Sequence, residues 1–174
     1  MRHIFLTGEI QVGKSTVVQK ALSGLNITLG GFRSGSGDER YEASRHLYLW
    51  DVTEPPICDE FHCVALLSRE KGCLPYPDRF DALGCAALRR AKETCADLIL
   101  MDECGFLERD AAEFQAEVLR TLDGDIPVFG VVRLRENSWT ESIRSHPNVT
   151  LVTVTEENRD ALPEQIVSLL KQNL

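Results

Sequence analysis

The sequence lacks a long apolar run, a basic run and a leader-like start, and each absence removes a class of protein. Its apolar stretches fall far short of the ~20 residues that span a bilayer. The first residues pass directly into a motif, so we expect neither a signal peptide nor an anchor. The net charge is −8 and no Lys/Arg-rich stretch could follow a phosphate backbone, so we expect no nucleic acid or membrane partner. The sequence predicts a cytoplasmic monomer.

A Cys-x-x-Cys pair is also missing. The six cysteines are Cys58, Cys63, Cys73, Cys85, Cys95 and Cys104. A chain of 174 residues can bury a sufficient core without disulfides, and free cysteine behaves as a small hydrophobic residue, so we expect buried free thiols. Cys58, His62 and Cys63 are close in sequence, but no fourth ligand accompanies them, which disfavours a zinc site.

The composition is that of one ordinary globular domain over residues 1–174, with 43% hydrophobic and 26% charged residues. Short apolar runs alternate with stretches of helical period, which predicts an α/β fold with a mainly parallel sheet and helices on both faces. The expected strands are 4–7, 27–32, 47–52, 61–67, 98–102, 128–133 and 149–155. The expected helices are 14–23, 79–95, one that starts at Asp110 with a capping box to Glu113, a short one after Ser138, and 161–170.

Two segments interrupt this alternation. Residues 33–45 are polar and Gly-rich, and no helix separates the strands on either side. They predict a hairpin insertion with a mobile loop. Residues 72–77 contain two prolines and predict a second loop.

A glycine-rich motif follows the first expected strand and opens the first expected helix. It matches G-x-x-x-x-G-K-[ST] at each fixed position and reads Gly8-Glu9-Ile10-Gln11-Val12-Gly13-Lys14-Ser15. In this context backbone N–H groups and the helix N-terminus surround phosphates. Lys14 is expected between the β- and γ-phosphates, Ser15 on Mg²⁺ and Thr16 at the α-phosphate. The sequence therefore predicts a P-loop NTPase sandwich of three layers, in which residues 8–16 bind the nucleotide.

Two acids end the expected strand 98–102. Four apolar residues lead into Asp102 and Glu103, at the place where such folds hold the metal opposite the phosphate loop. Asp102 is expected to bind Mg²⁺, mostly through water. Glu103 is expected to orient or deprotonate the attacking water. A solvated acidic pair at a strand end is the structural alternative.

Three segments together resemble the small P-loop nucleoside-triphosphatases, the family that includes the cancer-related nucleoside-triphosphatase and its thermophile relatives. They are the loop 8–16, the acidic stretch 101–108, which resembles Asp-Glu-Ile-Gly-Lys-Met-Glu, and the tail 154–160, which resembles Val-Thr-x-x-Asn-Arg-Asp. The resemblance implies slow hydrolysis of ATP, GTP and other nucleoside triphosphates. It also implies that the tail lies near the base, so Asn158 and Arg159 could contact the base; a helix cap and a surface salt bridge are the alternatives.

The chain departs from the family pattern at two places. Residues 33–40 replace a Thr and a Glu-Val-Arg segment, and Phe106 stands where a Lys is expected, so that cation is absent. An arginine of the insertion, Arg33, Arg40 or Arg45, could approach the γ-phosphate, or each could be a solvated charge.

The sequence thus favours a Mg²⁺-dependent hydrolase in which Lys14 and Glu103 are catalytic. A small-molecule or nucleotide kinase shares the phosphate loop, although it would need an Arg-rich lid; only Arg89 and Arg90 support that alternative. A nucleotide-gated binding module, in which residues 33–45 order on the γ-phosphate, is a third possibility.

Overall fold

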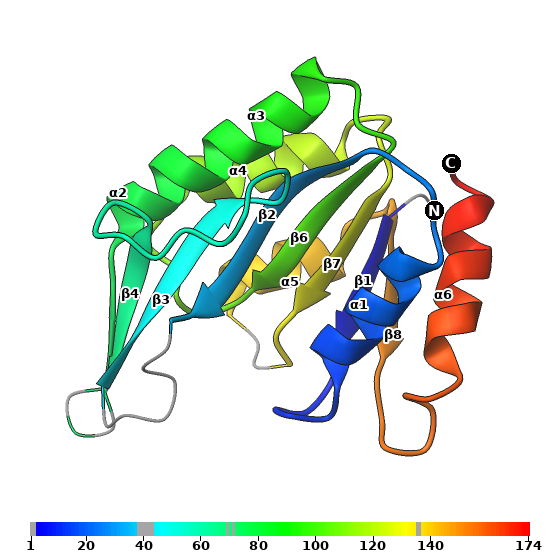
Figure 1. Ribbon diagram of the computed structural model, residues 1–174, viewed down its shortest axis with the longest axis horizontal. Coiled ribbons are helices and arrows are strands. Elements are labelled where there is room, and N and C mark those ends of the chain that lie inside the picture. The colour runs from blue at the N-terminus through cyan, green and yellow to red at the C-terminus, as the bar shows by residue number, and fades with distance from the viewer. Residues whose placement is uncertain (1–2, 38–43, 69, 71, 135–136) are drawn as a thin grey trace.

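The computed structural model describes residues 3–37, 44–68, 70, 72–134 and 137–174. They form an eight-stranded sheet with helices on both faces (Figure 1). Across the sheet the order is β5 (Gly72–Pro75), β4 (Cys63–Ser68), β3 (Ser44–Asp51), β2 (Leu29–Ser36), β6 (Leu98–Cys104), β7 (Val128–Val132), β1 (His3–Thr7) and β8 (Val149–Thr153). The α/β fold expected from the sequence is confirmed.

Five neighbouring strands, β2, β6, β7, β1 and β8, are parallel, and their carboxyl ends meet along one edge of the sheet. β6 lies between β2 and β7, and β1 lies between β7 and β8. The phosphate loop leaves β1 at this edge, and the acids of β6 reach the same edge. Residues distant in sequence are therefore brought together by strand order.

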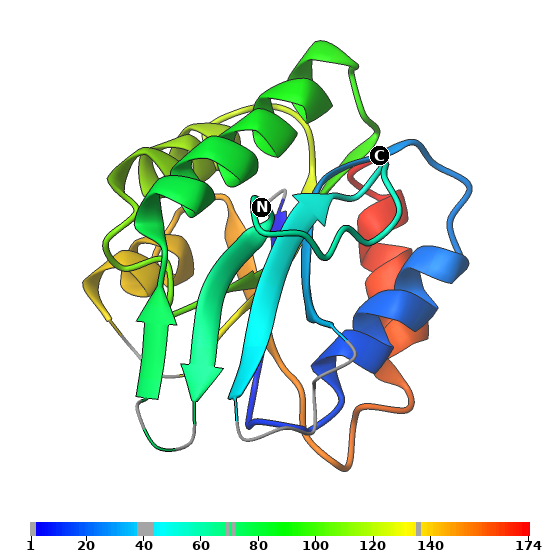
Figure 2. The ribbon, with the colours of Figure 1, turned by 60° about the vertical axis from the view of Figure 1, so that its left-hand side comes forward.

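The other part of the sheet is antiparallel, because β2, β3, β4 and β5 pair successively in opposite directions. Figure 2 turns these strands toward the viewer. The hairpin insertion is confirmed, although residues 38–43 at its tip, and with them Arg40, lie outside the described residues. The predicted loop 72–77 is wrong in its first part: residues 72–75 pair with Ser68 to Ala65 as an edge strand. Pro75 is tolerated there because an edge strand can spare a backbone donor.

Two helices cover one face and the others cover the opposite face (Figure 1). α1 (Lys14–Ser23) packs on α6 (Leu162–Lys171), and their side chains Val18 and Ile166 join Leu6 and Leu100 of the sheet in one core. The opposite layer contains α2 (Pro77–Arg79), η1 (Phe80–Gly84), α3 (Cys85–Glu93), α4 (Ala112–Leu122) and α5 (Ser138–Arg144). Each fully buried aliphatic or aromatic side chain in these cores contributes about 1.5–3 kcal/mol.

The predicted helix 79–95 contains a π-helical turn, η1, between α2 and α3. Gly84 lies at its end, where an added Cβ would lie 2.3 Å from Cδ2 of the Phe114 ring. The predicted capping box at Asp110 is wrong. Ala111 precedes α4 without a side-chain cap, Asp110 pairs with Arg109, and Asp81 of η1 accepts the Phe114 N–H at 2.8 Å instead.

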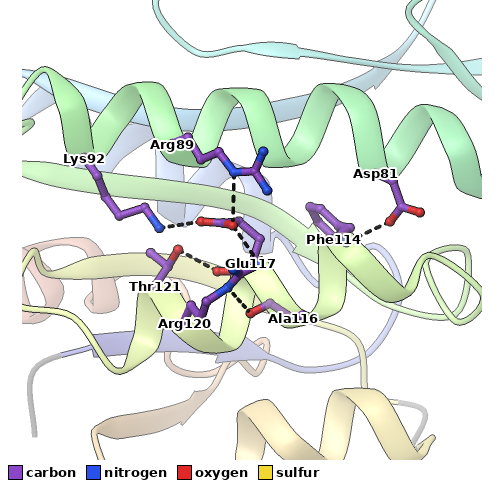
Figure 3. A network of polar contacts seen from close by, with 8 residues as sticks. All are labelled: Asp81, Arg89, Lys92, Phe114, Ala116, Glu117, Arg120 and Thr121. Atoms are coloured by element: carbon purple, nitrogen blue, oxygen red, sulfur yellow. Dashed lines mark hydrogen bonds and ion pairs between the residues drawn. The ribbon is translucent and has the colours of Figure 1, made fainter.

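An ion-pair network joins α3 to α4 around Glu117 (Figure 3). The Glu117 side chain is buried and accepts hydrogen bonds from Arg89 and Lys92 of α3 and pairs with Arg120 of its own helix. Burial alone would raise the pKa of Glu117, but the cations outweigh it and lower that pKa. The network therefore fixes the two helices as one layer.

The six cysteines, all within the described residues, are thiols rather than disulfides, as predicted. The expected burial is wrong for Cys58, Cys73 and Cys95, which are exposed. In the part of the chain that the structure describes, no group of at least three His, Cys, Asp or Glu side chains could hold a metal, so Cys58, His62 and Cys63 form no such site. Among the described helices none has the length and apolarity needed to cross a membrane.

Candidate functional site

A cavity of about 720 Å³ opens where the parallel strands end. It is lined by Gly8, Glu9, Ile10, Gln11, Gly13, Lys14, Ser15, Thr16, Glu103, Arg133 and Leu134. The phosphate loop and Glu103, which the sequence predicts to lie opposite each other, thus line the same cavity. Val12 belongs to the loop, but its side chain is buried in the core below it.

The loop keeps the conformation that its first glycine permits. Gly8 has φ +142°, and a Cβ there would lie 2.5 Å from the backbone oxygen of Val154, so a larger residue would displace the loop from the backbone that follows β8. At the other end of the loop the first turn of α1 begins at Lys14. Lys14, Ser15 and Thr16 of this turn line the cavity, and the unpaired N–H groups of a helix N-terminus favour a bound anion.

Lys14 lies across the loop that precedes it. Its Nζ donates to the backbone oxygens of Gly8 and Glu9, both at 2.7 Å. Burial lowers the pKa of Lys14; Arg133 adds to this effect and Glu103 opposes it. These charges therefore act on one another across the cavity.

Glu103 sits on an irregular part of β6. The register with β7 shifts between Met101 and Cys104, and Glu103 has φ +147°, a conformation that side-chain-bearing residues rarely adopt. Such strain persists only where the surrounding structure imposes it and is concentrated at functional sites. The Glu103 carboxylate accepts a hydrogen bond from Nε of Arg133.

Asp102 faces a second, smaller cavity of about 220 Å³, which Ser15, Glu103 and Arg133 also line. Burial raises the pKa of Asp102 to about 6, against the opposing effects of the Ser34 N–H at 3.4 Å and of Arg33. A cation beside this buried carboxylate would favour its charged form. Asp102 and Ser15 supply the oxygen ligands that Mg²⁺ prefers, and a phosphate-bound Mg²⁺ needs only one or two carboxylates from the protein. The residues therefore fit the ion.

The tail residues do not line the larger cavity in the part of the chain that is described. The Asn158 side chain closes a turn: its Oδ1 accepts the Thr155 N–H at 2.8 Å, and its Nδ2 donates to the Thr153 oxygen at 2.9 Å. Arg159 packs behind the loop and donates to the Val12 oxygen at 3.4 Å. These contacts differ from the two structural alternatives: Ala161 precedes α6 without a side-chain cap, and the Arg159 contact is with a backbone oxygen, not with a carboxylate. A base contact by either residue stays a prediction.

Among the described residues, the arginine that lines the larger cavity is Arg133. Arg33 and Arg45 do not line that cavity, and Arg40 lies outside the described residues. Arg45 lines only the smaller cavity, and Arg33 acts on the Asp102 charge. Sequence reasoning missed Arg133 although it placed this residue at the end of a parallel strand, the edge where such folds bind ligands.

The fold agrees with the comparisons with known proteins. Residues 3–167 match the family model described as NTPase. The chain belongs to the NTPase family. The nucleoside-triphosphatase THEP1 of Methanosarcina barkeri is 30% identical over 189 residues, which cover 99% of this chain and 99% of that protein. THEP1 of Thermotoga maritima is 28% identical over 185 residues, which cover 98% and 96% of the two chains.

Two solved structures share the fold of this NTPase family member. The crystal structure of THEP1 from Aquifex aeolicus has a TM-score of 0.78 at 24% identity and covers 97% of this chain and 99% of its own. The solution structure of a human cancer-related nucleoside triphosphatase has a TM-score of 0.72 at 23% identity, with 99% and 98% covered. The family resemblance inferred from the three motifs is confirmed.

Proposed function

We propose that the chain is a Mg²⁺-dependent nucleoside triphosphatase that hydrolyses ATP, GTP and related nucleotides to the diphosphate and phosphate. One observation carries the proposal: a single cavity is bounded by the phosphate loop with Lys14 and by Glu103 of a different strand. The relatives named nucleoside-triphosphatase, similar over nearly the whole chain, support it.

Each residue has a defined task in the proposed reaction. The loop amides and Lys14 hold the β- and γ-phosphates, and Glu103 accepts the proton of the attacking water. The water oxygen bonds to the γ-phosphorus, the bond from that phosphorus to the β,γ-bridging oxygen breaks, and the diphosphate leaves with the electron pair. Ser15 and Asp102 would hold Mg²⁺, which neutralises charge on the phosphate oxygens when bound.

Phosphate release from ATP or GTP, with Mg²⁺ and no acceptor, tests the proposal. Lys14→Ala should lower kcat/KM by about 100-fold or more, because a charge contact to the transferred phosphate is lost. Glu103→Gln should lower kcat by about 100-fold to 10,000-fold, the usual contribution of a general base. Lys20→Ala and Glu113→Gln remove the same charges from exposed helix positions and serve as matched controls. Folded wild-type protein that releases no phosphate above background would contradict the proposal.

The smaller cavity supports a kinase as the second candidate. Besides Asp102 and Glu103 it is lined by Ser34, Ser36 and Arg45, so an acceptor hydroxyl could lie where water would otherwise attack. Diphosphate formation that requires an added hydroxylated acceptor would favour the kinase. A cytoplasmic monomer without a nucleic acid partner stays a prediction, as does the nucleotide-gated binding module.

A further inference from the structure

Arg133 connects the two cavities, because its side chain lines both. It follows directly after β7, beside the irregular end of β6. Its Nε donates to Oε1 of Glu103. The two side chains are 46% and 35% exposed, so their ion pair is accessible to solvent.

Neighbouring residues leave room for the Arg133 side chain and hold its backbone in place. A Cβ on Gly105 would lie 2.8 Å from Cδ and 3.0 Å from Cγ of Arg133, so the missing side chain at 105 makes room for the arginine stem. On the other side Arg144 of α5 donates through Nη2 to the Arg133 backbone oxygen and, at 3.4 Å, to the hydroxyl of Thr7. Arg144 thereby ties the residue that precedes the phosphate loop to the residue that carries the guanidinium.

We propose that Arg133 senses the γ-phosphate by exchanging partners: it holds Glu103 in the structure described here and pairs with the γ-phosphate when a triphosphate is bound. The exchange releases the Glu103 carboxylate to accept the proton of the attacking water. Arg133 is then a positioning residue toward Glu103 and a catalytic residue toward the phosphate. The inference rests on the proposed function in that a triphosphate occupies the cavity.

The strengths of the two pairings favour this exchange. An ion pair as exposed as that of Arg133 with Glu103 contributes little, because water screens both charges. A terminal phosphate carries more negative charge than a carboxylate, and it accepts two parallel N–H groups from one guanidinium. Lys14 can exchange partners in the same way, because its Nζ donates to backbone oxygens of the loop that a phosphate oxygen can replace as acceptor. Both cations thus have local partners that a triphosphate can displace.

Because a diphosphate has no γ-phosphate, the exchange predicts selectivity between the two nucleotides. Calorimetry with Mg²⁺ would compare a non-hydrolysable β,γ-imido analogue of ATP with ADP. For Arg133→Ala we expect about a 10-fold loss of affinity for the analogue, as for one charge-assisted contact, and less than about a 2-fold change for ADP. Arg133→Lys should keep part of the selectivity, because it retains the charge and loses the planar fork.

Arg109→Ala is the matched control. Arg109 lies over the Phe106 ring, with its Cζ 4.1 Å from the ring centroid, pairs with Asp110 and lines neither cavity. Its removal should therefore leave the ratio of the affinities for the analogue and ADP unchanged. Thermal unfolding of each variant shows whether the fold is retained. An Arg133→Ala protein with the wild-type ratio of affinities, whether both fall together or neither falls, overturns the proposal.

A second measurement observes the exchange directly. The ¹⁵N signal of the Arg133 Nε–H group, identified by its disappearance in Arg133→Ala, should shift when the triphosphate analogue is added and stay in place with ADP. A signal unmoved by saturating analogue overturns the proposal. These results separate the two hypotheses: wild-type protein that binds the analogue and hydrolyses ATP while failing both tests refutes only the role of Arg133. Wild-type protein that binds neither nucleotide refutes the proposed function.

Discussion

Glu108 is a buried carboxyl group whose charge should destabilise the folded protein. Glu108 is 5% exposed, and its Oε2 accepts a hydrogen bond from the Gly105 N–H at 2.7 Å. Burial raises the pKa of Glu108 from 4.5 to about 7; Glu103 adds to the rise, while the Gly105 N–H and Arg133 oppose it. Replacing it by Gln keeps an oxygen acceptor for Gly105 and removes the ionisation.

The raised pKa of Glu108 determines the sign and the size of the change in unfolding free energy that Glu108→Gln should cause. An acid with a higher pKa in the folded state destabilises that state once it ionises, so its contribution falls as pH rises from 4.5 to about 7 and stays level above. That interval corresponds to about 3 kcal/mol. At pH 8 we therefore expect Glu108→Gln to raise the free energy of unfolding by about 3 kcal/mol, and at pH 4.5 by less than about 0.5 kcal/mol.

Urea denaturation of the metal-free and nucleotide-free proteins, at several pH values from 4.5 to 8, measures this difference. The difference between variant and wild type isolates Glu108 from the other titrating groups. Glu113→Gln, which removes the same charge from an exposed position on α4, should show little dependence on pH. If the Glu108→Gln difference stays constant across the range, or has the opposite sign at pH 8, the reasoning is refuted.

Three further changes test other parts of the molecule. The charge of Glu117 has the opposite effect on stability, because the pKa of Glu117 is lowered in the folded state. Its stabilising contribution is therefore present above pH 4.5 and is lost as the pH falls below that value. Glu117→Gln should cost about 1–3 kcal/mol at pH 7 in the same urea assay, because its cations are half exposed. Asp102→Asn should raise the Mg²⁺ concentration for half-maximal phosphate release by about 10-fold to 100-fold. Gly84→Ala should lower stability by about 1–3 kcal/mol in thermal unfolding, because its Cβ would overlap the Phe114 ring.

The positions that the sequence predicted correctly in the fold depend on local pattern. The phosphate loop is a contiguous motif between a strand and a helix, and Asp102 follows an apolar run, so neither needs knowledge of the sheet order. The misses depend on partners distant in sequence. Residues 72–75 form a strand only because they pair with β4. The start of α4 is satisfied by Asp81, whose approach follows from the packing of η1 against that helix.

Arg133 is a miss of the same kind. One arginine after an apolar run carries no motif, and its partner is set by the pairing of β6 with β7. A search of the strand ends for cations, made together with the search for acids, would have selected it. That search needs only the prediction of a parallel sheet, because all such ends meet at one edge.

The irregular backbone of β6 also allows two adjacent acids to line different cavities. Successive side chains of a strand point to opposite faces, and here the register shift after Met101 carries Glu103 to the larger cavity, which Asp102 does not line among the described residues. Asp102 instead lines the smaller cavity with Ser15. On the proposed function, the strained φ of Glu103 is the local cost of separating the two tasks proposed for this Asp-Glu pair, metal binding and water activation. Arg133, which contacts Glu103 and lines both cavities, is placed to couple these two proposed tasks.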